Sequence, residues 1–121
     1  MNNYKQHQVL AQQCALAIQN EFPNSRIFQR TVGLFYTKNQ TPIRIGFTGQ
    51  ADSYVYMKTN KGMITIEIEY KTGAGRQSKE QLTWQKLVES LGGTYIIARN
   101  SKEVIAQIYE KLKEQGTTHE C

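Results

Sequence analysis

The chain has 121 residues, of which 39% are hydrophobic and 21% are charged. This balance excludes a disordered chain, and a single domain covering residues 1–121 is long enough to bury one core. No apolar run approaches the ~20 residues that span a bilayer, and the first residues lack the apolar core of a signal peptide. We therefore expect a soluble protein that stays in the cytoplasm.

The formal net charge is +5, from 15 basic and 10 acidic residues. Such a charge suits a polyanionic partner but does not demand one. The two cysteines, Cys14 and Cys121, match neither a disulfide framework nor a zinc site. His7 and His119 lie in polar terminal segments, where nothing in the sequence indicates a role for them.

The first element in chain order is a helix predicted over residues 4–22 from the helical spacing of its apolar residues. These residues are Leu10, Cys14, Ala17 and Ile18. Extended structure follows. Residues 26–37 alternate well enough to be extended, 38–42 are typical of a turn or loop, and 43–48 are expected to form a short extended stretch.

A β-hairpin is predicted next, with strands over residues 52–57 and 63–71 and a turn at 59–62, where Gly62 allows a positive φ. The second strand has the clearest period of two in the chain. Its apolar face is predicted to consist of Ile64, Ile66, Ile68 and Tyr70. Its opposite face is predicted to carry Thr65, Glu67, Glu69 and Lys71.

A helix is then predicted over residues 78–91, with Ser78 as its N-cap and Gln81 completing a capping box. Its buried stripe is expected to be Trp84, Leu87, Val88 and Leu91. A strand over 94–98 and a helix over 101–115 follow, and the tail from Gly116 is expected to fray. The core is thus expected to cover residues 4–113. This order predicts an α/β fold with a central mixed β-sheet flanked by α-helices.

Three residues carry the candidate chemistry. Glu69 and Lys71 share one face of a strand, and the hairpin partner that begins at Asp52 brings a second carboxylate to the same edge. Paired carboxylates suit a hard cation such as Mg²⁺, which activates water beside a phosphodiester, and a nearby ammonium stabilises negative charge. The alternative is a solvated strand face, with Asp52 as a turn residue.

Several short segments, in order, resemble the VRR-NUC family, the virus-type replication-repair nucleases of the PD-(D/E)xK superfamily. The matching segments are Arg30-Thr31-Val32-Gly33, Gly49-Gln50-Ala51-Asp52, Ile68-Glu69-Tyr70-Lys71, Ser78-Lys79-Glu80-Gln81 and Gly92-Gly93. They fall within residues 26–100, most of the chain. The resemblance implies a restriction-endonuclease-like version of the predicted fold.

The resemblance also implies roles for individual residues. Asp52, Glu69 and the backbone carbonyl of Tyr70 would bind Mg²⁺ or Mn²⁺, Lys71 would position the attacking water, and Gln81 would reach the site from its helix. The residues implied to hold DNA phosphates are Arg30, Arg76 and Lys79.

One feature of the family pattern has no counterpart here. The family usually has a glutamate early in its first helix, whereas this stretch has glutamines at four positions. These are Gln6, Gln8, Gln12 and Gln13. Glu67 and Glu21 are the two residues considered as substitutes for this supporting carboxylate.

The resemblance implies a Mg²⁺- or Mn²⁺-dependent, structure-selective DNA endonuclease that resolves four-way (Holliday) junctions as a homodimer, in a phage or prophage setting. The alternatives are a branched-DNA-binding protein that does not cut and a less selective DNA nickase. Phe35, Tyr36 and Tyr56 are either part of a dimer surface or packed against neighbouring strands.

Overall fold

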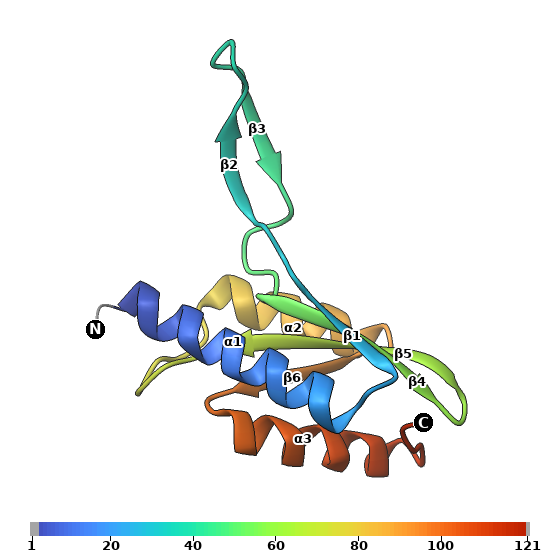
Figure 1. The fold of residues 1–121 in the computed structure, drawn as a ribbon. Helices are drawn as coiled ribbons and strands as arrows, with labels where there is room; N and C mark the ends of the chain where they lie inside the picture. Colours follow the sequence, from blue (N-terminus) through green and yellow to red (C-terminus); the bar gives the residue numbers. More distant parts are fainter. Residues whose placement is uncertain (1–2, 121) are drawn as a thin grey trace.

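The computed structural model describes residues 3–120 (Figure 1). Three helices are formed by α1 (Asn3–Glu21), α2 (Lys79–Ser90) and α3 (Ser101–Glu114). Six strands are formed by β1 (Ser25–Gln29), β2 (Gly33–Tyr36), β3 (Pro42–Ile45), β4 (Ser53–Thr59), β5 (Gly62–Tyr70) and β6 (Thr94–Ala98).

The central sheet has the strand order β1-β4-β5-β6, and the β5–β6 pair alone in it is parallel. The other two strands, β2 and β3, form a separate antiparallel hairpin that projects away from the sheet, and we call this hairpin the arm (Figure 1). The predicted α/β class, a mixed sheet flanked by helices, is confirmed.

The sheet lies between two helical layers. Helices α1 and α3 pack against each other and cover one face, while α2 lies on the opposite face beside β6. The core forms under α1 and α3, and its largest fully buried side chains include Ile18, Phe22, Met57, Ile66, Ile68, Tyr70 and Ile108. Strand β5 therefore sends Ile66, Ile68 and Tyr70 into this core, as its alternation predicts.

The polar face of β5 is also buried, which the sequence does not predict. Glu67 and Glu69 are 6% and 1% exposed, because the α2 layer covers this half of the sheet. A strand covered on both faces ordinarily carries apolar residues on both. Two buried carboxylates on such a strand must therefore be stabilised by specific partners.

The extended structure predicted over residues 26–37 is divided between two strands. β1 ends at Gln29 and β2 begins at Gly33, so the chain leaves the central sheet and enters the arm. Both segments alternate, and only their pairing partners, β4 for one and β3 for the other, distinguish them. Six apolar side chains in the arm and in the segment just after it are each 41–69% exposed. These are Leu34, Phe35, Tyr36, Ile43, Ile45 and Phe47.

The predicted buried stripe of α2 is wrong. The helix has no buried residue: Leu87 and Leu91 are 48% and 78% exposed, and Trp84 and Val88 are half-buried. The apolar period is present, but the helix covers polar side chains of β5 rather than an apolar sheet face. The apolar period therefore predicts that a helix forms here, but it does not predict how deeply the apolar side chains of that helix are buried.

The tail beyond α3 is held against the hairpin of β4 and β5. Asn60 N donates to Thr118 O (3.0 Å), Glu120 N donates to Lys58 O (3.0 Å), and Thr117 is buried. The expected fraying from Gly116 is thus not seen up to residue 120, and Cys121 lies outside the described residues. Among residues 3–120, no helix is both long and apolar enough to cross a membrane.

Candidate metal centre and active site

Asp52 lies at the end of the loop that leads into β4, and two backbone contacts fix it. Its Oδ2 accepts a hydrogen bond from the Tyr70 N–H (2.8 Å), and its carbonyl accepts one from the Arg30 N–H (2.8 Å). Three residues earlier, Gly49 has φ +92° and lies so close to Glu80 that a side chain there would collide with the backbone of α2. Glycine at this position therefore lets the loop lie against the start of α2.

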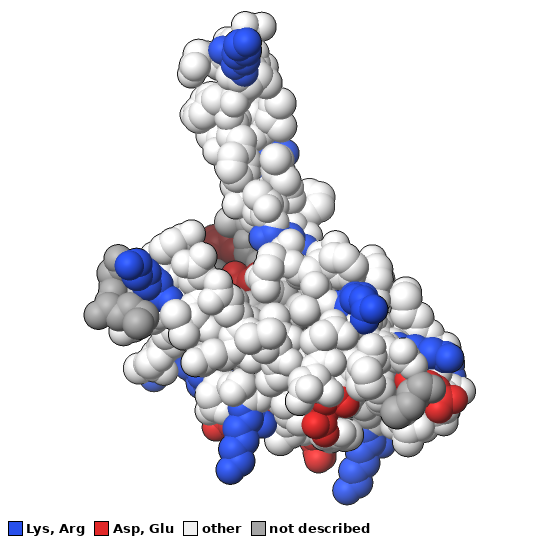
Figure 2. All heavy atoms as spheres, viewed as in Figure 1, with Lys and Arg blue, Asp and Glu red and all other residues white. Residues whose placement is uncertain are grey.

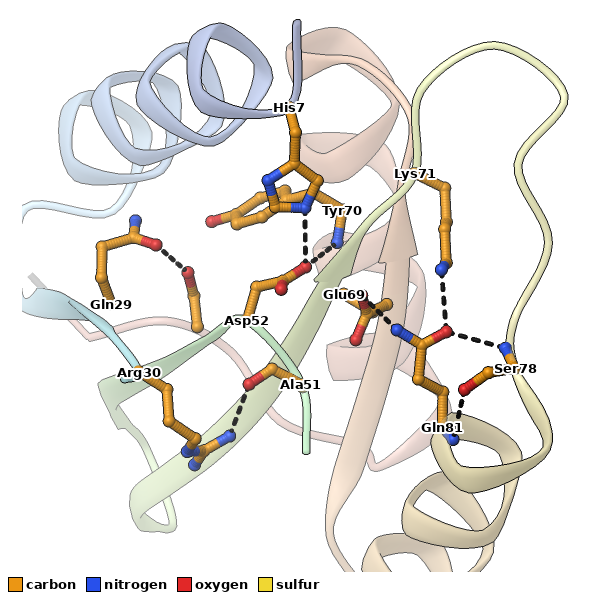
Figure 3. A network of polar contacts seen from close by, with 11 residues as sticks. His7, Gln29, Arg30, Ala51, Asp52, Glu69, Tyr70, Lys71, Ser78 and Gln81 are labelled. Atoms are coloured by element: carbon orange, nitrogen blue, oxygen red, sulfur yellow. Dashed lines mark hydrogen bonds and ion pairs between the residues drawn. The ribbon is translucent and has the colours of Figure 1, made fainter. Parts of the chain in front are cut away.

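Glu69 lies on β5 beside Asp52 (Figure 3) and is 1% exposed. Its Oε2 accepts a hydrogen bond from Gln81 Nε2 (3.0 Å), whereas its Oε1 accepts none from any described residue. Burial above all, together with the neighbouring Asp52 carboxyl, raises the pKa of Glu69 to about 9. Without a cation, the two carboxyls therefore retain a proton between them at neutral pH.

Gln81 joins Glu69 to Lys71. Its side-chain oxygen accepts hydrogen bonds from Lys71 Nζ (2.7 Å) and from the Ser78 N–H (2.8 Å), while its Nε2 donates to Glu69 (Figure 3). The Gln81 N–H in turn donates to Ser78 Oγ (3.1 Å). The predicted capping box is confirmed, and the same amide that caps α2 also reaches the carboxylate.

His7 also lies at this site, although no pattern in the sequence indicates a role for it. Its Nε2 lies 3.1 Å from Asp52 Oδ2, and its ring packs edge-on against the Tyr70 ring, with centroids 5.8 Å apart (Figure 3). One ligand atom each from His7, Asp52 and Glu69 lie within 4.8 Å of one another. The sequence offered one indication of this residue. In residues 6–13, the stretch compared with the first-helix glutamate of VRR-NUC nucleases, only His7 has a side chain that commonly binds metals.

These three residues fit a divalent cation. They offer two carboxylates and an imidazole around a common point, and the free Oε1 of buried Glu69 is an acceptor without a donor. A cation there would neutralise the repulsion that otherwise requires Glu69 to be protonated. The ligand role of the Tyr70 carbonyl stays a prediction.

Neither expected substitute for the family's first-helix glutamate lies in this group. Glu67 forms a two-bond ion pair with Arg30 (Nη1–Oε1 2.7 Å, Nη2–Oε2 3.0 Å) and also accepts from Trp84 Nε1 (2.9 Å). Glu21 instead accepts a hydrogen bond from Tyr109 Oη (2.6 Å). His7 is instead the residue of α1 that lies in this group.

The three residues expected to hold phosphate have different surroundings. Arg30 is half-buried, and besides Glu67 its guanidinium donates to Ala51 O and lies over the Tyr54 ring, 4.7 Å from its centroid. Arg76 and Lys79 are exposed, in the loop before α2 and at its first turn. The structure thus leaves the last two accessible to a ligand, while Arg30 holds the site together.

A hollow of about 300 Å³ opens beside His7 and Asp52, between α1 and the point where β1 ends and β4 begins. It is lined by Tyr4, His7, Gln8, Ala11, Gln12, Gln29, Arg30 and Asp52. Figure 2 shows acidic atoms in a recess where the arm joins the body, next to basic atoms. Gln8 and Gln12 of α1 therefore line the hollow beside Asp52.

Comparisons of the chain with protein-family models, with curated proteins and with solved structures gave no match.

Proposed function

We propose that the protein is a Mg²⁺- or Mn²⁺-dependent DNA endonuclease that cleaves phosphodiester bonds at Asp52, Glu69 and Lys71. The observation that carries this proposal is the free acceptor Oε1 on buried Glu69, a residue that groups with Asp52 and His7. The other oxygen of Glu69 is joined through Gln81 to the Lys71 ammonium. Few purely structural arrangements leave a buried carboxylate oxygen without a donor. The short segments that resemble those of VRR-NUC nucleases, in the same order along the chain, support the same proposal.

Each residue has a separate task in the proposed reaction. When bound, a divalent cation would polarise the phosphodiester and lower the pKa of a bound water. Asp52 and Glu69 would bind the cation through their carboxylates, and the hydrogen bond from the Tyr70 N–H keeps the Asp52 carboxylate oriented. Lys71 holds its ammonium 2.7 Å from Gln81, on the Glu69 side of the site, where it orients the attacking water or stabilises negative charge on the phosphate.

The open half of the sheet supports DNA as the substrate. Helix α2 packs on β6, and on the same face β1 and β4 present an aromatic cluster in which Phe28 stacks on Tyr54 (centroids 5.1 Å) beside Tyr56. Arg26 and Lys58 flank this cluster and are exposed. Aromatic faces with neighbouring cations suit the bases and phosphates of an unpaired strand, as in branched DNA.

We further propose a homodimer that acts on four-way junctions, in which two equivalent phosphodiesters are presented to two sites. The exposed apolar side chains of the arm support self-association, because an isolated two-stranded hairpin is marginal in water. A cytoplasmic, phage- or prophage-encoded protein remains part of this proposal.

The test uses labelled four-way junction, linear duplex and single-stranded DNA, each with Mg²⁺, Mn²⁺ or EDTA. We expect metal-dependent cutting, strongest on the junction, and a loss of at least about 100-fold in rate for Glu69→Gln with DNA binding retained. The matched control is Glu103→Gln, which removes an exposed carboxylate from α3. Binding without cutting under every metal condition would instead favour a non-catalytic DNA-binding protein, and equal cutting of all three substrates a less selective nuclease.

A further inference from the structure

We propose that His7 is the third protein ligand of the divalent-cation site and that it makes the site prefer Mn²⁺ to Mg²⁺. This inference deepens the proposed function, because it concerns the same two carboxylates. It goes further in naming a ligand from α1 and the metal preference that this ligand gives.

The position of His7 is fixed by the helix that carries it. His7 precedes Leu10, Ala11 and Cys14 by three, four and seven residues, so it continues their face of α1. These three residues are 6%, 8% and 0% exposed and anchor that face against the sheet. The imidazole of His7 is thereby held at the end of the buried stripe, over Tyr70 and facing Asp52.

A second, independent observation points to a ligand at this place. Glu69 is 99% buried, since 1% of it is exposed, yet its Oε1 has no hydrogen-bond partner among the described residues. An unsatisfied buried carboxylate oxygen is costly. The His7–Asp52 contact does not satisfy it, whereas a cation within reach of all three side chains does.

A purely structural role for His7 is the competing explanation. In that case, its hydrogen bond to Asp52 would only fix α1 to the loop before β4, and His7→Ala would lower stability without changing metal binding. The geometry favours a ligand, because one atom each from His7, Asp52 and Glu69 lie within 4.8 Å of one another. A hydrogen bond alone needs only the first two residues.

The ligand set decides which metal is bound most tightly. Mg²⁺ demands oxygen ligands and keeps most of its waters, whereas Mn²⁺ and later first-row metals accept an imidazole nitrogen readily. Two carboxylates with one imidazole therefore favour Mn²⁺. Replacing His7 by glutamate gives an all-oxygen set and moves the preference back toward Mg²⁺.

The experiment measures metal binding by the full-length protein without DNA, by Mn²⁺ electron paramagnetic resonance and by Mg²⁺ competition. We expect His7→Ala to weaken Mn²⁺ binding by about tenfold or more and to affect Mg²⁺ less. We expect His7→Glu to recover Mg²⁺ binding and lower the Mn²⁺-to-Mg²⁺ affinity ratio. Gln13→Ala, an exposed substitution on α1 outside the hollow, is the control expected to leave both affinities unchanged.

A measurement on the unsubstituted protein keeps the inference testable if a His7 variant fails to fold. Substoichiometric Mn²⁺ should broaden the imidazole resonances of His7 far more than those of His119, which lies against Phe22. Equal broadening of the two imidazoles, or unchanged affinities in folded His7→Ala, overturns the inference. Mn²⁺ binding through His7 without DNA cleavage would leave the inference standing and contradict the proposed function alone.

Discussion

At the scale of single residues, the site depends on a buried carboxyl whose charge is unfavourable without a cation. Glu69 has three neighbours that act on it differently: Asp52 raises its pKa, Lys71 lowers it, and Gln81 donates to one of its oxygens. Burial is the largest influence, so Glu69 remains protonated until pH about 9. This gives a direct prediction about stability and pH.

In the metal-free protein, Glu69 should make stability fall as pH rises from about 4.5, its ordinary pKa, to about 9. The folded state binds the Glu69 proton more tightly than the unfolded state, so the stabilising contribution is complete below pH 4.5 and is lost as pH rises through 9. We expect Glu69→Gln to remove this decline, measured as Tm in EDTA from pH 5 to 9. Parallel curves for Glu69→Gln and unsubstituted protein would contradict the assigned environment, and Glu89→Gln is the exposed control.

A saturating divalent cation should reverse this pH dependence. It binds the ionised carboxylates of the folded state only, so added Mn²⁺ should raise Tm more at pH 8 than at pH 5. The measurement is thermal unfolding with Mn²⁺ or EDTA at each pH. An equal shift at both values would indicate that the metal binds elsewhere on the chain, and Glu69→Gln should lose most of the shift at pH 8.

At the scale of elements, a buried ion pair links β1, β5 and α2. Arg30 follows β1, Glu67 lies on β5, and Trp84 on α2 donates to the same carboxylate. The Arg30 and Glu67 side chains are 17% and 8% exposed. This contact holds α2 over the sheet although the helix buries no residue of its own, and it thereby keeps Gln81 beside Glu69.

Removing one partner of this pair should be strongly destabilising. We expect Arg30→Met to cost about 3 kcal/mol in urea unfolding, because it leaves the Glu67 charge buried without its guanidinium. The double variant Arg30→Met/Glu67→Gln should be less destabilised than Arg30→Met alone. Glu114→Gln, which breaks the exposed pair with Lys111, serves as the control with an expected cost below about 1 kcal/mol. Similar costs for the buried and exposed pairs would refute this assignment.

At the scale of the whole molecule, the arm stands clear of the body (Figure 1), and the segment that returns from it to the body ends at Asp52, just before β4. Figure 2 shows mostly uncharged atoms along the arm and basic atoms at its tip. None of its exposed apolar residues belongs to the core, so the arm contributes little to the stability of an isolated chain. Its exposed surface is better explained by association than by folding.

We expect Phe35→Ser/Ile43→Ser to convert a dimer into a monomer. The two residues are directly paired across the arm and share one of its faces, so the substitutions remove one continuous apolar strip. Light scattering measures the mass, and Tm of the monomeric body should change little. The matched control is Leu87→Ser/Leu91→Ser, which removes two exposed apolar side chains at the C-terminal end of α2 and should leave the proposed dimer intact. Retention of the dimer by the arm variant would remove the arm from the interface.

By itself, the sequence determined the elements whose period is strong and local. The helix and strand periods predict α1, β5, α2, β6 and α3 to within a few residues, and the capping box at Ser78 and Gln81 is local chemistry that needs no tertiary contact. Strand alternation and the hairpin also singled out Asp52, Glu69 and Lys71, which the structure brings together, whereas the role of Gln81 in the site was implied by the family resemblance alone. The capping box and the Asp52, Glu69 and Lys71 prediction hold because the residues concerned lie on one helix turn, on one strand, or on the two strands of one hairpin.

Only the tertiary structure decided burial depth and long-range partners. It separated β1 from β2, left Leu87 and Leu91 exposed, and placed His7 against Asp52, 45 residues away in sequence. The physical reason is that periodicity fixes which side chains share a face, whereas the layer packed against that face fixes their burial and partners. The spacing of His7 to Leu10, Ala11 and Cys14 places it on their face of α1, but only the structure shows that His7 meets Asp52 where α1 crosses the end of the sheet.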